Sequence, residues 1–239
     1  REVYVTPEDV LNVDIEKFQI ETVSPQMLDE MHRLFTEKSQ SCFPIPMHYG
    51  TLVTRAVLEF GWEPFLMAAA VDAERFGKIC ERFGLASLAV IEGWANIKEV
   101  ELITFHDDIA GTRGLFMSPN WYRKYALPWY GKFIDIAHKN GKKIMYLSDG
   151  NYLDILDDLL ELGPDGFFIE STSVDPEILM QRAGRDKLYM LKTDTRNIDF
   201  GSPEDIRREI MKIRRLHQQY HGIFMYHGGR RSPENIEAF

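Results

Sequence analysis

A repeating pattern constrains this chain most: a short apolar run, a polar residue at its end, and then a helix that opens with a capping residue and proline. An N-cap side chain accepts a hydrogen bond from the first helical turn, where the N–H that proline lacks would have no partner anyway. The pattern predicts helix starts at Ser118-Pro119, Asp175-Pro176, Ser202-Pro203 and Ser232-Pro233. Ser24-Pro25 predicts a further helix, through Leu34.

The apolar runs that precede these helices predict strands at residues 100–105, 143–147, 166–169, 187–192 and 222–226, with 43–47 as a further candidate. Short apolar strands that alternate with helices of ten or more residues are typical of βαβ units in a parallel sheet. One apolar stripe at helical spacing should pack on that sheet: Tyr122, Tyr125, Ala126, Trp129, Phe133 and Ile136. We therefore expect an α/β barrel.

Length and composition fit one domain over residues 1–239, in which 1–42 carry only a weak pattern. The chain begins at Arg1 rather than Met, which suggests a fragment. It lacks the run of about 18 apolar residues that a membrane span needs, so we expect a soluble, cytoplasmic protein. The two cysteines, Cys42 and Cys80, cannot build a disulfide framework and fit a reducing compartment.

Charge and motifs also limit the possible ligands. A formal net charge of -9 disfavours nucleic acid, because phosphate binding depends on clustered Lys and Arg. Neither a P-loop nor a dinucleotide fingerprint follows a predicted strand, so we expect no nucleotide cofactor. The partner we expect is a small-molecule substrate. The sequence leaves the oligomeric state open, with a homodimer as one alternative.

Polar residues end five successive predicted strands. In a parallel barrel these ends form one rim, which carries the active site in essentially every characterised case. The catalytic candidates are Asp107, Asp108, Asp149, Glu170 and His227, and the candidates for substrate binding are His106, Ser148, Asn151, Asp194, Arg196 and Tyr226. Each one alone also fits a turn or cap, but together they predict a polar site.

Three of the candidates allow a more specific expectation. Asp107 and Asp108 are adjacent, so their side chains should point to opposite faces and only one should enter the barrel mouth. Burial after an apolar run would raise the pKa of Glu170, unless a cation or metal compensates. His227, which precedes Gly228-Gly229, can titrate, bind a metal or hold a carboxylate, and a purely structural histidine is an equal alternative.

Several stretches together resemble one family. They are residues 107–112, Met117-Ser118-Pro119, Tyr122-Arg123, Leu127-Pro128-Trp129, Ser148-Asp149-Gly150-Asn151, Glu170, Asp194, residues 200–204, His227-Gly228 and residues 232–235. Over residues 44–239 the chain resembles the uroporphyrinogen decarboxylase superfamily, which includes the cobalamin-dependent methyltransferases. The resemblance implies a distorted TIM (β/α)8 barrel with its cleft at the strands' carboxyl ends. It also implies that the first strand or strands are missing from this chain.

The resemblance bears on metals as well. Thiol-directed methyltransferases of the family hold zinc with a His-x-Cys pair and a further Cys, and the corresponding positions here are Leu147, Asp149 and the neighbourhood of His227. The thiolate ligands are therefore gone. Asp149, Glu170 and His227 could still offer oxygen and nitrogen ligands, which leaves zinc as the candidate metal.

The resemblance implies three alternative functions. The leading one is methyl transfer with a small methylated substrate or acceptor, in which a partner protein carries the corrinoid (cobalamin). The second is cofactor-independent decarboxylation of a tetrapyrrole, with Asp108 and His227 in binding roles. The third is a non-catalytic member that binds a corrinoid protein or a small ligand.

Overall fold

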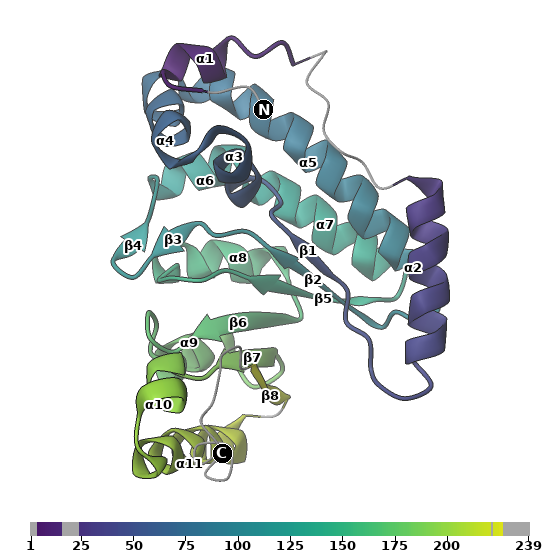
Figure 1. Cartoon of the computed structure of the whole chain (residues 1–239), viewed down its shortest axis with the longest axis vertical. Coiled ribbons are helices and arrows are strands. Elements are labelled where there is room, and N and C mark those ends of the chain that lie inside the picture. The colour runs from purple at the N-terminus through teal and green to yellow at the C-terminus, as the bar shows by residue number, and fades with distance from the viewer. Residues whose placement is uncertain (1–3, 16–23, 221, 227–239) are drawn as a thin grey trace.

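A computed structural model describes residues 4–15, 24–220 and 222–226 (Figure 1). Its main sheet is parallel throughout and has the strand order β1-β2-β5-β6-β7-β8. These strands are β1 (Met47–Tyr49), β2 (Leu102–His106), β5 (Lys143–Leu147), β6 (Gly166–Glu170), β7 (Leu188–Lys192) and β8 (Ile223–Tyr226). Apart from the small antiparallel hairpin of β3 (Ala110–Gly111) and β4 (Gly114–Leu115), the strands follow chain order, as βαβ crossovers require.

Helices pack against one face of the sheet. The helices are α1 (Pro7–Leu11), α2 (Pro25–Lys38), α3 (Val53–Phe60), α4 (Trp62–Val71), α5 (Ala73–Ala95), α6 (Pro119–Tyr125), α7 (Leu127–Lys139), α8 (Leu156–Leu162), α9 (Pro176–Ala183), α10 (Thr195–Phe200) and α11 (Pro203–Gln219), with a 3-10 turn at Leu153–Ile155. In Figure 1, α5 and α7 run side by side along the sheet, while α9, α10 and α11 gather beside β6, β7 and β8. None of the described helices is both long enough and apolar enough to cross a bilayer.

The sheet is apolar on both faces. One face packs with the helices into the main core, which includes Phe105, Tyr130 and Phe167. The opposite face carries a smaller apolar cluster: Leu102, Met145, Leu147 and Phe168, with Ile45, Leu188 and Met190 packed against it. Burial on both sides explains why these strands read as continuous apolar runs rather than as alternating sequences. The smaller cluster lines the face on which the candidate site lies.

The predicted helix starts agree with the structure where it describes them. The side chains of Ser24, Ser118, Asp175 and Ser202 each accept a hydrogen bond from a backbone N–H in the first turn of their helix. Ser232-Pro233 lies outside the described residues. The α/β class and the parallel sheet are confirmed, and the predicted strands recur with shifts of one or two residues at their ends.

Proline explains two differences from the sequence prediction. The strand expected at residues 43–47 is instead Met47–Tyr49, because Pro44 and Pro46 have no N–H for the ladder. The single apolar stripe belongs to two helices, α6 and α7, that meet at Ala126. Pro128 lies in the first turn of α7, where its missing N–H costs nothing, whereas inside one continuous helix it would break a hydrogen bond.

Candidate active site

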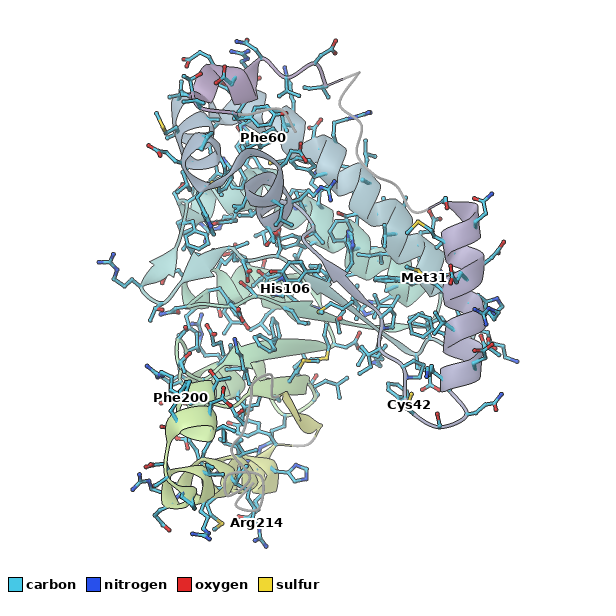
Figure 2. All side chains as sticks on the ribbon, viewed as in Figure 1. Met31, Cys42, Phe60, His106, Phe200 and Arg214 are labelled. Atoms are coloured by element: carbon cyan, nitrogen blue, oxygen red, sulfur yellow. The ribbon has the colours of Figure 1, made fainter. Side chains whose placement is uncertain are left out.

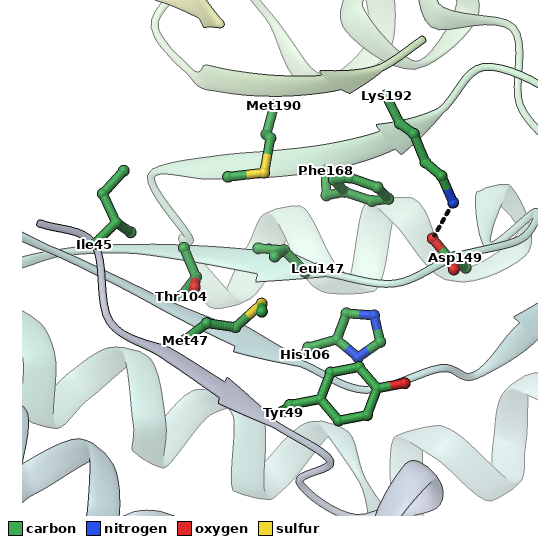
Figure 3. A pocket seen from close by; sticks show the side chains of 10 residues that line it. All are labelled: Ile45, Met47, Tyr49, Thr104, His106, Leu147, Asp149, Phe168, Met190 and Lys192. Atoms are coloured by element: carbon green, nitrogen blue, oxygen red, sulfur yellow. Dashed lines mark ion pairs between the residues drawn. The ribbon is translucent and has the colours of Figure 1, made fainter. Parts of the chain in front are cut away.

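A cavity of about 270 Å³ lies on the face of the sheet that carries the smaller apolar cluster (Figure 3). Successive side chains of a strand point to opposite faces, so every second residue of each strand can face the cavity. The lining follows that rule: Ile45, Met47 and Tyr49 near β1; Thr104 and His106 on β2; Leu147 and Asp149 at β5; Phe168 on β6; Met190 and Lys192 on β7. The site is thus assembled from the inward-facing residues of five neighbouring strands.

The cavity has an apolar part and a polar end. Met47, Leu147, Phe168 and Met190 supply most of the apolar lining. Polar side chains lie where the strands end, with His106 last in β2 and Lys192 last in β7. The parallel register sets Tyr49 beside His106 and Glu170 beside Lys192. Carboxylates, an imidazole and an ammonium group therefore meet at one end of a small apolar chamber.

His106 is the most deeply buried ionisable side chain of the cavity lining, with 9% of its side chain exposed. Its Nε2 lies 3.3 Å from Oδ1 of Asp108. Its ring stacks on Tyr49 with the ring centroids 4.5 Å apart. Nδ1 is buried and has no hydrogen-bond partner among the described residues. The imidazole is therefore held in position by stacking and by one carboxylate, and only one of its two nitrogens has a described polar partner.

Asp108 lies two residues beyond His106, on the same side of the chain. Its Oδ1 accepts a hydrogen bond from the backbone N–H of Asp149, at 2.9 Å. Burial is the main cause that raises the pKa of Asp108, and the nearby carboxylates of Asp149 and Glu170 add to it, while His106 acts in the opposite direction. The negative charges of this region are thus close enough to disfavour one another.

Glu170 and Lys192 form an ion pair, with Nζ 2.8 Å from Oε1. Burial would raise the pKa of Glu170, but hydrogen bonds from Lys192, Ser173 Oγ and the Gly150 N–H outweigh it and lower that pKa. Burial would likewise lower the pKa of Lys192, but the two carboxylates it contacts, Glu170 and Asp149, raise it. Both partners are therefore charged at neutral pH, and Lys192 is the compensating cation.

Asp107 points to the other side of the strand and does not line the cavity. Its carboxylate, which is fully buried, accepts hydrogen bonds from the backbone N–H groups of Leu52, Val53 and Thr54, at the start of α3, and from Tyr130 Oη. Burial raises the pKa of this carboxyl group against the effect of those hydrogen bonds. Of the two adjacent aspartates, Asp108 therefore contacts two residues of the cavity lining, His106 and Asp149, without lining the cavity itself, and Asp107 anchors α3.

Four other candidates make local contacts and do not line the cavity. Ser148 Oγ donates to the carbonyl of Asp149 and accepts from the N–H of Ile109. Asn151 accepts a hydrogen bond from the N–H of Leu153. Asp194 caps α10 and pairs with the exposed Arg196. The side chain of Tyr226 and all of His227 lie outside what the structure describes, so their roles stay predictions.

Three polar lining residues are not among the candidates from the sequence: Tyr49, Thr104 and Lys192. Lys192 carried a usable signal, because it is the only charged residue in the apolar run Leu188–Lys192 and alternates with Met190. Tyr49 and Thr104 carried none, because an aromatic or threonine side chain in a strand is ordinary.

Two of the metal ligands expected from the sequence, Asp149 and Glu170, both lie beside Lys192 Nζ, and the third, His227, is not described, so this ligand set stays a prediction. A different trio is close together: one ligand atom from each of His106, Asp108 and Asp149, all within 4.8 Å of one another. A thiolate zinc site does not fit, since Cys80 is buried and Cys42 is exposed at the periphery, far from His106 (Figure 2).

Comparison with known proteins identifies the family. Residues 51–235, more than half of the chain, match the family described as uroporphyrinogen decarboxylase (URO-D), so the chain belongs to that family. A solved structure of a methyltransferase from Methanosarcina mazei superposes with a TM-score of 0.71 at 16% identity, covering 95% of this chain and 67% of that one. That likeness confirms the TIM-barrel type of fold. No curated protein matches the sequence.

Proposed function

We propose that this chain is a methyltransferase of the URO-D family that binds a small methylated substrate or acceptor in the cavity, with a corrinoid carried by a partner protein. The observation that carries the proposal is the cavity, which is small and mostly apolar, with polar groups at one end. Its volume of about 270 Å³ lies just below the range of about 300–1,000 Å³ typical of pockets for drug-sized ligands.

The cavity suits a small molecule better than a tetrapyrrole with several carboxylates. A polycarboxylate needs cationic partners, and no arginine is among the described lining residues. The one lysine, Lys192, is already paired with Glu170 and lies 3.6 Å from Asp149. Like charges near a carboxylate substrate cost binding energy unless they are compensated. We therefore favour methyl transfer over decarboxylation.

The residues of the chain have distinct parts in this proposal. The apolar lining, chiefly Leu147, Phe168 and Met190, holds the carbon skeleton of the substrate and excludes water. His106 Nε2 and Asp108 Oδ1 lie where they can orient the heteroatom that gives or receives the methyl group, and can hold a proton for it. A corrinoid supplies the cobalt that carries the methyl group, and the cavity is too small to enclose one. The name of the Methanosarcina mazei neighbour supports the same reaction class.

The test is an assay of the complete protein with methylcobalamin and a panel of small thiol, amine and phenol acceptors. Loss of the methyl group is measured by the change in cobalamin absorbance. Met47→Trp should fill part of the cavity and raise KM at least tenfold. Met211→Trp is the matched control: this methionine is equally exposed, at 51%, but lies on α11 outside the cavity, so kinetics should not change. If the protein leaves methylcobalamin intact with every acceptor and converts uroporphyrinogen to a decarboxylated product, the proposal is wrong.

A further inference from the structure

We infer that a small monovalent anion, such as chloride or formate, binds between Thr51 and Arg55 in a second pocket behind β1. This pocket lies where β1, α3 and α5 meet (Figure 1). His48 lines it and alternates along β1 with Met47 and Tyr49, which face the first cavity, so the two pockets are on opposite sides of the strand. The inference is independent of the proposed methyl transfer.

Thr51 gives the first indication of a ligand. This residue is fully buried and lines the second pocket, yet its Oγ1 has no hydrogen-bond partner among the described residues. Buried polar groups are normally paired, because a hydroxyl that has lost its contacts with water and gained no partner is costly. The Thr51 hydroxyl therefore needs a partner inside the pocket.

Arg55 supplies positive charge to the same pocket. Its Nε is buried without a partner, and its guanidinium makes no ion pair in the part of the chain that the structure describes. Burial is the main cause that lowers the pKa of His48, and the charge of Arg55 adds to it, so the guanidinium acts on the interior of the pocket. Arg82, whose Nε is likewise buried and unpaired among the described residues, lies one turn of α5 before Ala86 in the pocket wall. Because no carboxylate is among the described lining residues, this positive charge is locally uncompensated.

The hydrogen-bonding capacity of the pocket fits an anion better than a water molecule. A guanidinium N–H can only donate, and the Thr51 hydroxyl can donate as well. Ser87 is already in use, because its Oγ donates to the Thr51 carbonyl at 3.3 Å and lies 3.0 Å from Nε2 of His48. An anion would accept hydrogen bonds from both Thr51 and Arg55, would bring no hydrogens that need acceptors of their own, and would offset the charge of Arg55. A water molecule would do only the first of these.

The size of the second pocket limits the anion. Its volume is about 30 Å³, whereas one water molecule needs about 10–15 Å³. The space therefore suits a halide or formate and is too small for phosphate or sulfate. An anion held there would join the end of β1 to α3, close to Tyr49, which stacks on His106 in the candidate active site.

The test uses bromide as the probe and the complete protein. In crystals that contain bromide, an anomalous scattering peak should lie within hydrogen-bond distance of Thr51 Oγ1 and Arg55 Nε. In solution, bromide replaces gluconate, which is too large for the pocket, at constant ionic strength, and Tm is measured at each step. We expect half-saturation below about 150 mM, the physiological ionic strength. At about 0.5 M bromide, Tm should rise by about 2–6 °C more in the wild type than in Thr51→Val, which loses the hydroxyl but keeps the shape.

Matched variants separate this pocket from general effects of salt. Thr51→Val and Arg55→Gln should each weaken bromide binding by about tenfold or more, because each removes a hydrogen bond to a charged group. Thr112→Val and Arg113→Gln make the same two changes at exposed positions in the turn between β3 and β4, and they should bind bromide as the wild type does. Only water between Thr51 and Arg55, half-saturation above about 150 mM, or an Arg55→Gln variant that responds to bromide as the wild type does would overturn the inference. None of these outcomes bears on the proposed methyl transfer.

Discussion

Replacing Asp107 by asparagine should destabilise the fold, because four donors converge on this one buried carboxylate. Its Oδ2 accepts hydrogen bonds from the N–H groups of Leu52 and Val53 and from Tyr130 Oη, and its Oδ1 accepts from the N–H of Thr54 at 2.7 Å. Asparagine keeps one oxygen, so its NH₂ group must face at least one of these donors. The change preserves shape and volume, which isolates the polar contribution.

The magnitude follows from that geometry. If the amide oxygen takes the place of Oδ2, the N–H of Thr54 and one hydrogen of the new amide stay unpaired, and each buried unpaired group costs about 1–3 kcal/mol. The negative charge at the start of α3 is also lost, which adds roughly 0.3–1 kcal/mol. Relief of the buried charge offsets part of the sum. We expect the free energy of unfolding to fall by about 2–4 kcal/mol, from a total that is about 5–15 kcal/mol for natural proteins.

Urea unfolding followed by circular dichroism measures this change, with the slope of the transition checked for constancy. Asp108→Asn, at the next position, is the control and should change stability by less than about 1 kcal/mol, because only the backbone N–H of Asp108, which the change keeps, hydrogen-bonds α3. Tyr130→Phe should cost about 1.5–3 kcal/mol, because it removes a single hydrogen bond to a charged group. A loss below 1 kcal/mol in Asp107→Asn would refute the structural role that we assign to this aspartate.

Two further predictions concern the surroundings of the site. Burial, with a smaller contribution from Arg55, lowers the pKa of His48 to about 4. In the unfolded chain the same imidazole binds a proton below about pH 6.5, so the free energy of unfolding should fall by about 3 kcal/mol from pH 6.5 to pH 4. NMR titration of the His48 imidazole would measure its pKa, and a midpoint near pH 6.5 would contradict the prediction. His48→Gln should flatten the dependence of the unfolding free energy on pH. Both Gly150 and Gly141 have a positive φ, +81° and +70°, but an added Cβ would meet the carbonyl of Ala110 only at Gly150. Gly150→Ala should therefore lower the free energy of unfolding in urea more than Gly141→Ala does. Equal losses would argue against close packing at Gly150.

Much of the fold was available from the sequence, because the signals involved are local. Capping pairs such as Ser118-Pro119 act within one turn of helix, and apolar runs such as Lys143–Leu147 reflect burial on both faces of a strand. The order of the parallel strands then follows chain order, because consecutive strands of a βαβ series usually lie side by side. The position of β1 was misplaced by a few residues, because the pattern of apolar residues near Pro44 and Pro46 does not show which N–H groups join the ladder.

The site was only half visible in the sequence. That polar residues end neighbouring strands could be read directly, and His106, Asp108 and Asp149 were among them. The sequence does not show which of these side chains face one another, because a shift of one residue in strand register turns every side chain to the other face. Asp107 and Asp108 look alike in the sequence, and only the packing of α3 against the end of β2 separates the aspartate that anchors the helix from the one that contacts His106.

What the amino-acid order determined by itself was the alternation of strands and helices, and with it the gathering of polar groups at the strand ends. What the tertiary structure decided was their pairing: Glu170 with Lys192, across the neighbouring strands β6 and β7, and His106 with Asp108, at the end of β2. The physical reason is that side-chain direction and burial depend on contacts between distant segments. Those contacts also set the pKa of each group, since burial and neighbouring charge are properties of the folded chain.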